Sequence, residues 1–165
     1  MTIRLFLVAI LSSFLFIVGC SQTQVDNIDL KTESSMNEDF PPRIPGYVEA
    51  NGLQFEMEQG GFKWETKDQA VITDAASPNQ IAERFETVVL APKTELSIQL
   101  EGQPYIIVYL WEGEHREKEV LLNNNRISLP EMKGRYIYEV IANWSSYGSD
   151  NARGEVSYTF VVEVE

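Results

Sequence analysis

Apolar and polar residues alternate with a period of two along most of the chain after residue 46, the pattern that indicates β-strands exposed on one face. The longest such segments are residues 136–144 and 156–164, in which every second residue is apolar. No segment carries a helical period long enough for an ordinary helix. Many short strands separated by turn residues predict an all-β protein built as an antiparallel β-sandwich.

The first part of this region predicts a hairpin with little helix beside it. Residues 53–57 and 62–65 alternate on either side of Gly60-Gly61, and a pair of glycines tolerates the positive φ angles of a tight turn. Residues 70–74 predict a short third strand. Ser77, Pro78 and Gln80 have the order of an N-cap, a first-turn proline and a capping-box partner, so one or two helical turns should extend to Glu83.

From Thr87 onward the pattern becomes regular and predicts about seven strands. Residues 105–111 are apolar throughout, as expected of a central strand, and residues 112–118 are charged and predict a connection. Residues 119–122 and 126–129 lie on either side of three asparagines and should form a pair. The other predicted strands are residues 87–91, 96–100, 136–144 and 156–164.

The segment Gly134-Arg135-Tyr136-Ile137-Tyr138 resembles the start of the sixth strand of immunoglobulin-like domains. The resemblance implies that Tyr136 forms a tyrosine corner, with its hydroxyl group bonded to backbone upstream. Antibody domains have a cysteine where this chain has Tyr138, so the inter-sheet disulfide is absent, as in fibronectin-III-like domains. The resemblance covers about residues 85–165 and leaves the hairpin region to add strands to one sheet.

The amino-terminal segment predicts export and a lipid anchor. Arg4 precedes an apolar run over residues 5–18, which has the length of a signal-peptide core and is too short for a spanning helix. The run ends in Ile17-Val18-Gly19-Cys20, which resembles the lipobox of bacterial lipoproteins. The resemblance implies a diacylglycerol on the Cys20 thiol and cleavage just before it. The alternatives are an uncleaved membrane helix and an ordinary cleaved signal that leaves a free thiol.

These features divide the chain into a signal peptide (1–19), a flexible tether (20–46) and a sandwich domain (47–165). The tether is polar and acidic, and its few apolar residues follow no period. The formal net charge of −12 argues against nucleic acid and against an electrostatic grip on anionic lipid. We therefore expect a location at the outer side of the cell membrane.

Few residues are candidates for catalysis, and no cofactor or metal site is expected. His115 is the single histidine and lies in the charged segment, where a solvated loop is the simpler interpretation. Cys20 is the single cysteine and is assigned to the anchor. Four alternating glutamates are interpreted as a solubilising face rather than a calcium site; they are Glu112, Glu114, Glu117 and Glu119.

The predicted loop over residues 145–154 joins the two longest strands, and long loops on a rigid sandwich are a frequent place for binding. The binding candidates are therefore Trp144, Tyr147, Asp150 and Arg153. A hairpin connection without a partner is the alternative. Trp64 and Trp111 are expected to lie in the core.

Together these features predict a non-catalytic binding or accessory lipoprotein whose partner is an envelope protein, a peptide or a glycan. Two alternatives remain open. One is a hydrolase that uses carboxylates alone, which would need two of them facing each other across a cleft. The other is a protease-inhibitor-like domain, because residues 60–64 bear a faint likeness to an inhibitor loop.

Overall fold

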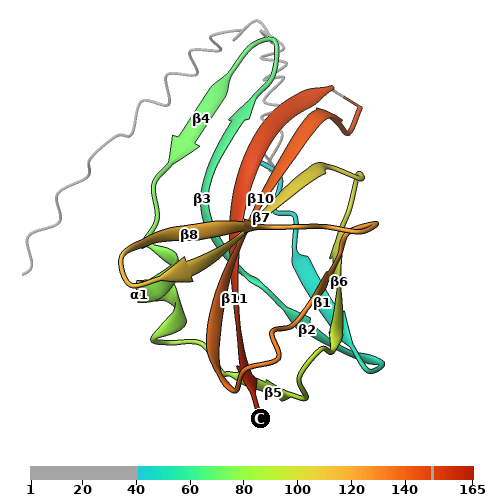
Figure 1. Cartoon of the computed structure of the whole chain (residues 1–165). Helices are drawn as coiled ribbons and strands as arrows, with labels where there is room; N and C mark the ends of the chain where they lie inside the picture. Colours follow the sequence, from blue (N-terminus) through green and yellow to red (C-terminus); the bar gives the residue numbers. More distant parts are fainter. Residues whose placement is uncertain (1–40, 150) are drawn as a thin grey trace, which may run out of the picture. The chain divides into compact units, whose positions relative to one another are not determined.

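The computed structural model describes residues 41–149 and 151–165, which form two β-sheets and one short helix (Figure 1). The four-stranded sheet has the order β2-β1-β6-β9, and all its neighbours are antiparallel. Its strands are β1 (Gly46–Ala50), β2 (Leu53–Glu56), β6 (Glu95–Leu100) and β9 (Arg126–Ser128).

The seven-stranded sheet has the order β4-β3-β11-β10-β7-β8, and β5 adds a parallel partner to β11. Its long central strands are β10 (Gly134–Tyr147) and β11 (Ala152–Val164), which pair along almost their whole length. The others are β3 (Glu58–Glu65), β4 (Ala70–Thr73), β5 (Val88–Leu90), β7 (Tyr105–Glu112) and β8 (His115–Val120).

The core lies between the two sheets and confirms the predicted all-β sandwich. It joins residues such as Val48, Leu96 and Ile127 of the smaller sheet to Val108, Val140 and Phe160 of the larger one in a single buried cluster. The inward positions of β10 and β11 are the apolar positions of the alternating pattern. Apolar burial of this kind is the main source of stability of such a fold.

From about residue 85 onward the chain forms seven strands, β5 to β11, which is the number that the sequence predicts for this part. The Tyr136 hydroxyl group donates to the carbonyl oxygen of Met132 over 2.7 Å, which is the expected tyrosine corner. Tyr138 is buried on the same side of β10, and its ring stacks on Phe160 with centroids 4.9 Å apart.

The hairpin predicted around Gly60-Gly61 is wrong, because both glycines lie inside β3. The turn in this region is Asn51-Gly52, which has positive φ at both residues and joins β1 to β2. In β3 the two glycines face the single residue Ser157 of β11, which makes a β-bulge. A side chain at Gly60 would collide with the Ser157 hydroxyl group, so the close approach of the two strands requires glycine.

The predicted pairing of residues 119–122 with 126–129 is also wrong. Residues 119 and 120 end β8, which pairs with β7, whereas β9 pairs with β6 in the other sheet. The three asparagines therefore lie on a crossover between sheets, closed only by a bridge from Asn123 to Arg126. Most of the predicted connection 112–118 is strand, since Gly113-Glu114 alone separate β7 from β8.

The sequence predicts that the folded domain starts at Tyr47, but ordered packing begins a few residues earlier. Ile44 is buried in the core, and its carbonyl oxygen accepts a 2.8 Å hydrogen bond from the buried Tyr158 hydroxyl group. Residues 20–40 of the predicted tether, with Cys20 among them, and the predicted signal peptide lie outside the described residues.

The helix α1 (Pro78–Ala82) forms where the capping pattern predicts it. Ser77 accepts from the Gln80 backbone N–H, and the Gln80 side chain accepts from the Ser77 backbone N–H. The helix contacts β10 and β11 on the face of the larger sheet that points away from the core, and the Arg135 guanidinium donates to the Ala82 carbonyl oxygen over 2.6 Å. It covers only part of that outer face.

Candidate binding groove

The uncovered part of the outer face of the seven-stranded sheet forms a groove of about 870 Å³. One wall is the connection from β4 to α1, and the other is the β7–β8 hairpin. Small-ligand sites in proteins have volumes of about 300–1,000 Å³, so this hollow has a suitable size. Its lining includes the side chains of Lys63, Asp74, Trp111, Arg116, Glu139, Ile141, Glu155 and Ser157.

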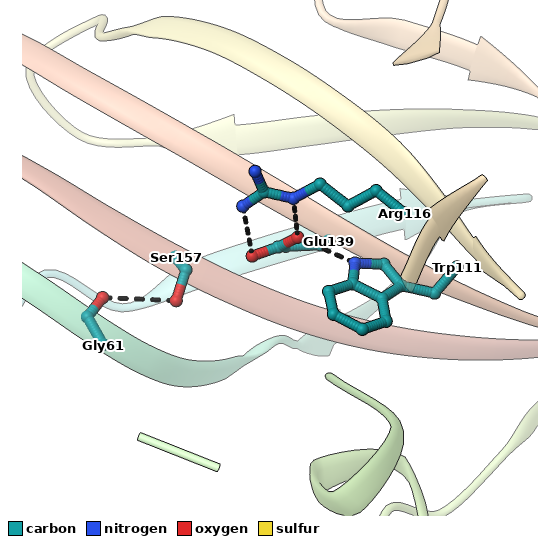
Figure 2. A network of polar contacts seen from close by, with 5 residues as sticks. All are labelled: Gly61, Trp111, Arg116, Glu139 and Ser157. Carbon is teal, nitrogen blue, oxygen red and sulfur yellow. Dashed lines mark hydrogen bonds and ion pairs between the residues drawn. The ribbon is translucent and has the colours of Figure 1, made fainter. Parts of the chain in front are cut away.

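A carboxylate that was not among the predicted site residues organises one side of the groove (Figure 2). Glu139 of β10 is buried, and its two oxygens accept from the Arg116 guanidinium at 2.7 and 3.0 Å. The Trp111 indole N–H donates to the same carboxylate over 2.7 Å. Both planar groups are therefore held in fixed orientations by one side chain.

The register of β7 and β8 explains why Arg116 reaches this carboxylate. Tyr109 pairs with Glu119, and uninterrupted alternation would place Glu117 opposite Trp111. A bulge between these pairs places Arg116 opposite Trp111 instead. The bulge thus replaces a carboxylate by a guanidinium on the outer face, and the guanidinium also lies 4.6 Å from the centre of the Tyr109 ring.

The Arg116–Glu139 pair is asymmetric in exposure, with 46% of the arginine side chain and 7% of the glutamate side chain accessible. The hydrogen bond to Glu139 is the main cause that raises the pKa of Arg116, against a smaller opposing effect of burial. The Glu139 carboxylate is therefore buried beneath the groove surface, and part of the Arg116 guanidinium is exposed to solvent.

The other side of the groove is fixed by the glycine bulge of β3. The Ser157 hydroxyl group donates to the Gly61 carbonyl oxygen over 3.2 Å, across the two strands (Figure 2). Next to this bulge, Lys63 of β3 is paired with Glu155 of β11, and both side chains are exposed. Together with Ser157 they place an ammonium, a carboxylate and a hydroxyl group along the floor.

Trp111 departs from its predicted place in the core. It is half-buried on the outer face, whereas Trp64 is fully buried between the sheets as predicted. The pattern could have indicated this, because Trp111 shares the parity of the exposed Tyr105 and not that of Val108. The position of Glu139 could also have been predicted. It lies between Ile137 and Ile141 on the face of β10 that points away from the core, and a charged residue between two apolar ones indicates a special role on that face.

The predicted binding loop is short in the structure, because β10 continues to Tyr147 and β11 begins at Ala152. Trp144 is buried, and its indole N–H donates to the Glu101 carbonyl oxygen over 2.8 Å. Tyr147 is half-buried, and its ring centre lies 5.7 Å from that of Trp64. Burial raises the pKa of Tyr147, with a smaller contribution from the charge of Glu101.

Arg153 is exposed and forms a 3.2 Å ion pair with Glu65, and Asp150 lies outside the described residues. A smaller hollow of about 380 Å³ brings Arg153 and Trp144 together, but Tyr147 does not line it. The side chains of Trp144, Tyr147 and Arg153 do not line the larger groove. Their binding role stays a prediction.

His115 is exposed at the start of β8 and lines the groove beside Arg116. The four glutamates of the predicted acidic face are exposed on β7, β8 and the turn between them. Across residues 41–149 and 151–165, no three His, Cys, Asp or Glu side chains come together as a possible metal site.

The segment with a likeness to an inhibitor loop, residues 60–64, lies within β3, and its residues 62–64 pair with both β4 and β11. The inhibitor-like alternative stays a prediction. In the described part of the chain, no helix is long and apolar enough to cross a membrane.

Comparisons of the chain with protein-family models, with curated proteins and with solved structures find no match.

Proposed function

We propose that this chain is a bacterial envelope lipoprotein, anchored through a lipid on Cys20 at the outer side of the cell membrane, and that its sandwich is a non-catalytic binding module. The observation that carries the binding role is the groove with its fixed Trp111–Glu139–Arg116 network. Side chains held in place before a ligand arrives lose little conformational entropy on binding, which favours affinity.

The carboxylate geometry favours binding over the hydrolase alternative. Glu139 lines the groove, but both its oxygens already accept hydrogen bonds from Arg116, so neither is free to act on a substrate. Asp74 and Glu155 are exposed, and no hydrogen bond or ion pair from the described residues orients either side chain. Catalysis by two carboxylates depends on fixed positions, which these two lack.

The anchor is tested by producing the full chain in a bacterium that processes lipoproteins and measuring the intact mass of the mature protein. We expect a mass that begins at Cys20 and includes a diacylglycerol, and we expect Cys20→Ala to remain unprocessed or to leave the membrane fraction. A wild-type protein with a free thiol at Cys20 would disprove the anchor and leave the groove as a separate question.

The binding role is tested with a variant that fills the groove. Ala75 is exposed on the wall, so Ala75→Trp should obstruct the groove without removing an internal contact. Ala70→Trp is the matched control, because Ala70 is also exposed but does not line the groove. Immobilised full chain is exposed to fragmented cell envelope, and the retained material is analysed by mass spectrometry.

We expect retention by the wild type and the Ala70→Trp variant and loss of retention with Ala75→Trp. Equal retention by both variants would locate binding outside the groove. Retained material that is progressively shortened would instead support the hydrolase.

A further inference from the structure

We propose that the ligand of the groove is an uncharged oligosaccharide and that one of its sugar rings stacks on the indole of Trp111; this inference rests on the proposed binding function. Three features of the groove lead to it: a fixed aromatic ring, a floor that offers mainly side chains because its strands are paired within the sheet, and a near balance of charge.

The aromatic ring is the first feature. Trp111 is half-buried in the groove lining, and its N–H is already bonded to Glu139, so its polar atom is engaged and its ring is held in place. The apolar face of a sugar ring packs well on such a surface, because its C–H groups point at the aromatic face, which carries partial negative charge. Figure 2 shows the Glu139 carboxylate between the Trp111 indole on one side and the Arg116 guanidinium on the other.

The floor is the second feature. β11, β10 and β7 are paired with a neighbouring strand on both sides, and so is β3 over residues 62–65, so most backbone N–H and C=O groups of the floor are used within the sheet. At the β3 bulge the Gly61 carbonyl oxygen accepts from the Ser157 hydroxyl group instead. A peptide bound in extended form gains most of its affinity from backbone hydrogen bonds at a free sheet edge. The floor offers mainly side chains, which suits a ligand recognised through its rings and hydroxyl groups.

The charges are the third feature. Lys63 is opposite Glu155 and Arg116 is paired with Glu139, which leaves Asp74 as the unbalanced charge among the acidic and basic lining residues. A groove with this balance, on a chain with a formal charge of −12, does not attract a polyanion. Its ammonium donor, carboxylate acceptors and Ser157 hydroxyl group match sugar hydroxyls, which both donate and accept.

The three tryptophans provide a direct measurement. Trp64 and Trp144 are 0% and 3% exposed, so Trp111 is the one accessible to a quencher. Full-length protein in a detergent without a sugar headgroup is titrated with cellohexaose, chitohexaose and laminarihexaose, and acrylamide quenching is measured at each concentration. We expect at least one of them to protect the fluorescence at least twofold.

Variants assign that protection to the ring, with affinity measured by calorimetry. Trp111→Ala should weaken binding roughly tenfold, the amount expected for loss of one aromatic contact. Tyr105→Ala is the matched control: Tyr105 is an aromatic residue on the same face of β7, is 69% exposed and does not line the groove. Its affinity should stay within a factor of two of the parent.

The proposal is overturned if none of the three oligosaccharides protects Trp111 at millimolar concentration, or if Trp111→Ala binds as well as the parent. It is also overturned if an extended hexapeptide or a polyanionic oligogalacturonate protects Trp111 where the uncharged sugars do not. The binding function itself would still be supported if envelope material retained by the wild type is lost with Ala75→Trp. Failure of the oligosaccharide proposal can therefore be distinguished from failure of the binding function.

Discussion

Glu139 is the single charged residue that is buried among residues 41–149 and 151–165. Burying a carboxylate and part of a guanidinium costs desolvation energy, and apolar replacements of such pairs are often neutral or stabilising. The pair therefore contributes little to net stability. Its clear structural effect is to hold the Trp111 indole and the guanidinium in one orientation.

Loss of one partner should nevertheless be costly. We expect Arg116→Met to lower the free energy of unfolding by about 1–3 kcal/mol, because Glu139 is left with the indole N–H as its remaining partner. In a Glu139→Gln background the same substitution should cost less, since an amide is easier to bury than a charge. Denaturant unfolding of the four proteins gives the coupling; equal costs in both backgrounds would show that the two side chains act independently.

Tyr158 and Tyr136 make the same kind of hydrogen bond at different depths. The bond from Tyr158 to Ile44 is buried, whereas that from Tyr136 to Met132 is exposed. Tyr158→Phe should therefore cost about 1–3 kcal/mol, because the acceptor is left unpaired in the core. Tyr136→Phe should cost about 0.5–1.5 kcal/mol, because water can replace the lost donor. The reverse order of denaturant midpoints would contradict this assignment.

Tyr158 also predicts how stability depends on pH. Burial is the main cause that raises its pKa, with a smaller contribution from Tyr147, so the folded state retains a proton that the unfolded state loses. The stabilising contribution is complete below about pH 10, the ordinary value, and is lost as the pH rises above it. The alkaline decrease should be shallower in Tyr158→Phe, though still present because burial also raises the pKa of Tyr138.

At the scale of single elements, the glycine bulge of β3 makes the sharpest prediction. Gly60→Ala should cost about 0.5–1.5 kcal/mol, because the new methyl group displaces the Ser157 hydroxyl group from the Gly61 carbonyl oxygen. In the Ser157→Ala background the nearest remaining side-chain atom, the Cβ of residue 157, is 3.6 Å away, an ordinary contact. The penalty for Gly60→Ala should therefore vanish there, as measured by thermal unfolding; an undiminished penalty would indicate backbone strain instead.

The sequence predicted the strands better than their partners. Alternation identifies one face of β10 and β11, and the capping residues of α1 act locally, so both were predictable. The role of Gly60-Gly61 was not, because a turn and a bulge use the same residues, and the choice depends on Ser157, almost a hundred positions away. Asn51-Gly52 is the stronger turn signal of the two, because an Asn-Gly pair favours the positive φ angles of a two-residue hairpin turn.

The groove could be predicted in part. Glu139 and Trp111 lie on the non-core positions of their strands, and that parity was visible in the sequence. Their contact with Arg116 depends on a bulge in β8, which shifts the register with β7 by one residue. Residues 114–119 are almost all charged, so no apolar–polar alternation in the sequence indicates where this shift occurs. The candidates Trp144 and Tyr147 were chosen from a loop that the structure assigns largely to strands.

At the scale of the whole molecule, the start of the folded domain can be tested by truncation. A chain that begins at Tyr47 lacks Ile44, and burial of such a side chain contributes about 1.5–3 kcal/mol. It also lacks the acceptor of the Tyr158 hydroxyl group. We expect a chain that begins at Pro41 to unfold at a clearly higher temperature; equal midpoints would show that residues 41–46 contribute nothing to the domain.

The position of β11 has a consequence for synthesis. Among the described strands it is the last in the sequence, yet it pairs with β3, β10 and β5 in the middle of the larger sheet. While residues 152–164 are still in the ribosome, β3 lacks its inner partner and much of the core has nothing to pack against. A nascent chain is therefore unable to complete the sandwich until these residues have left the ribosome.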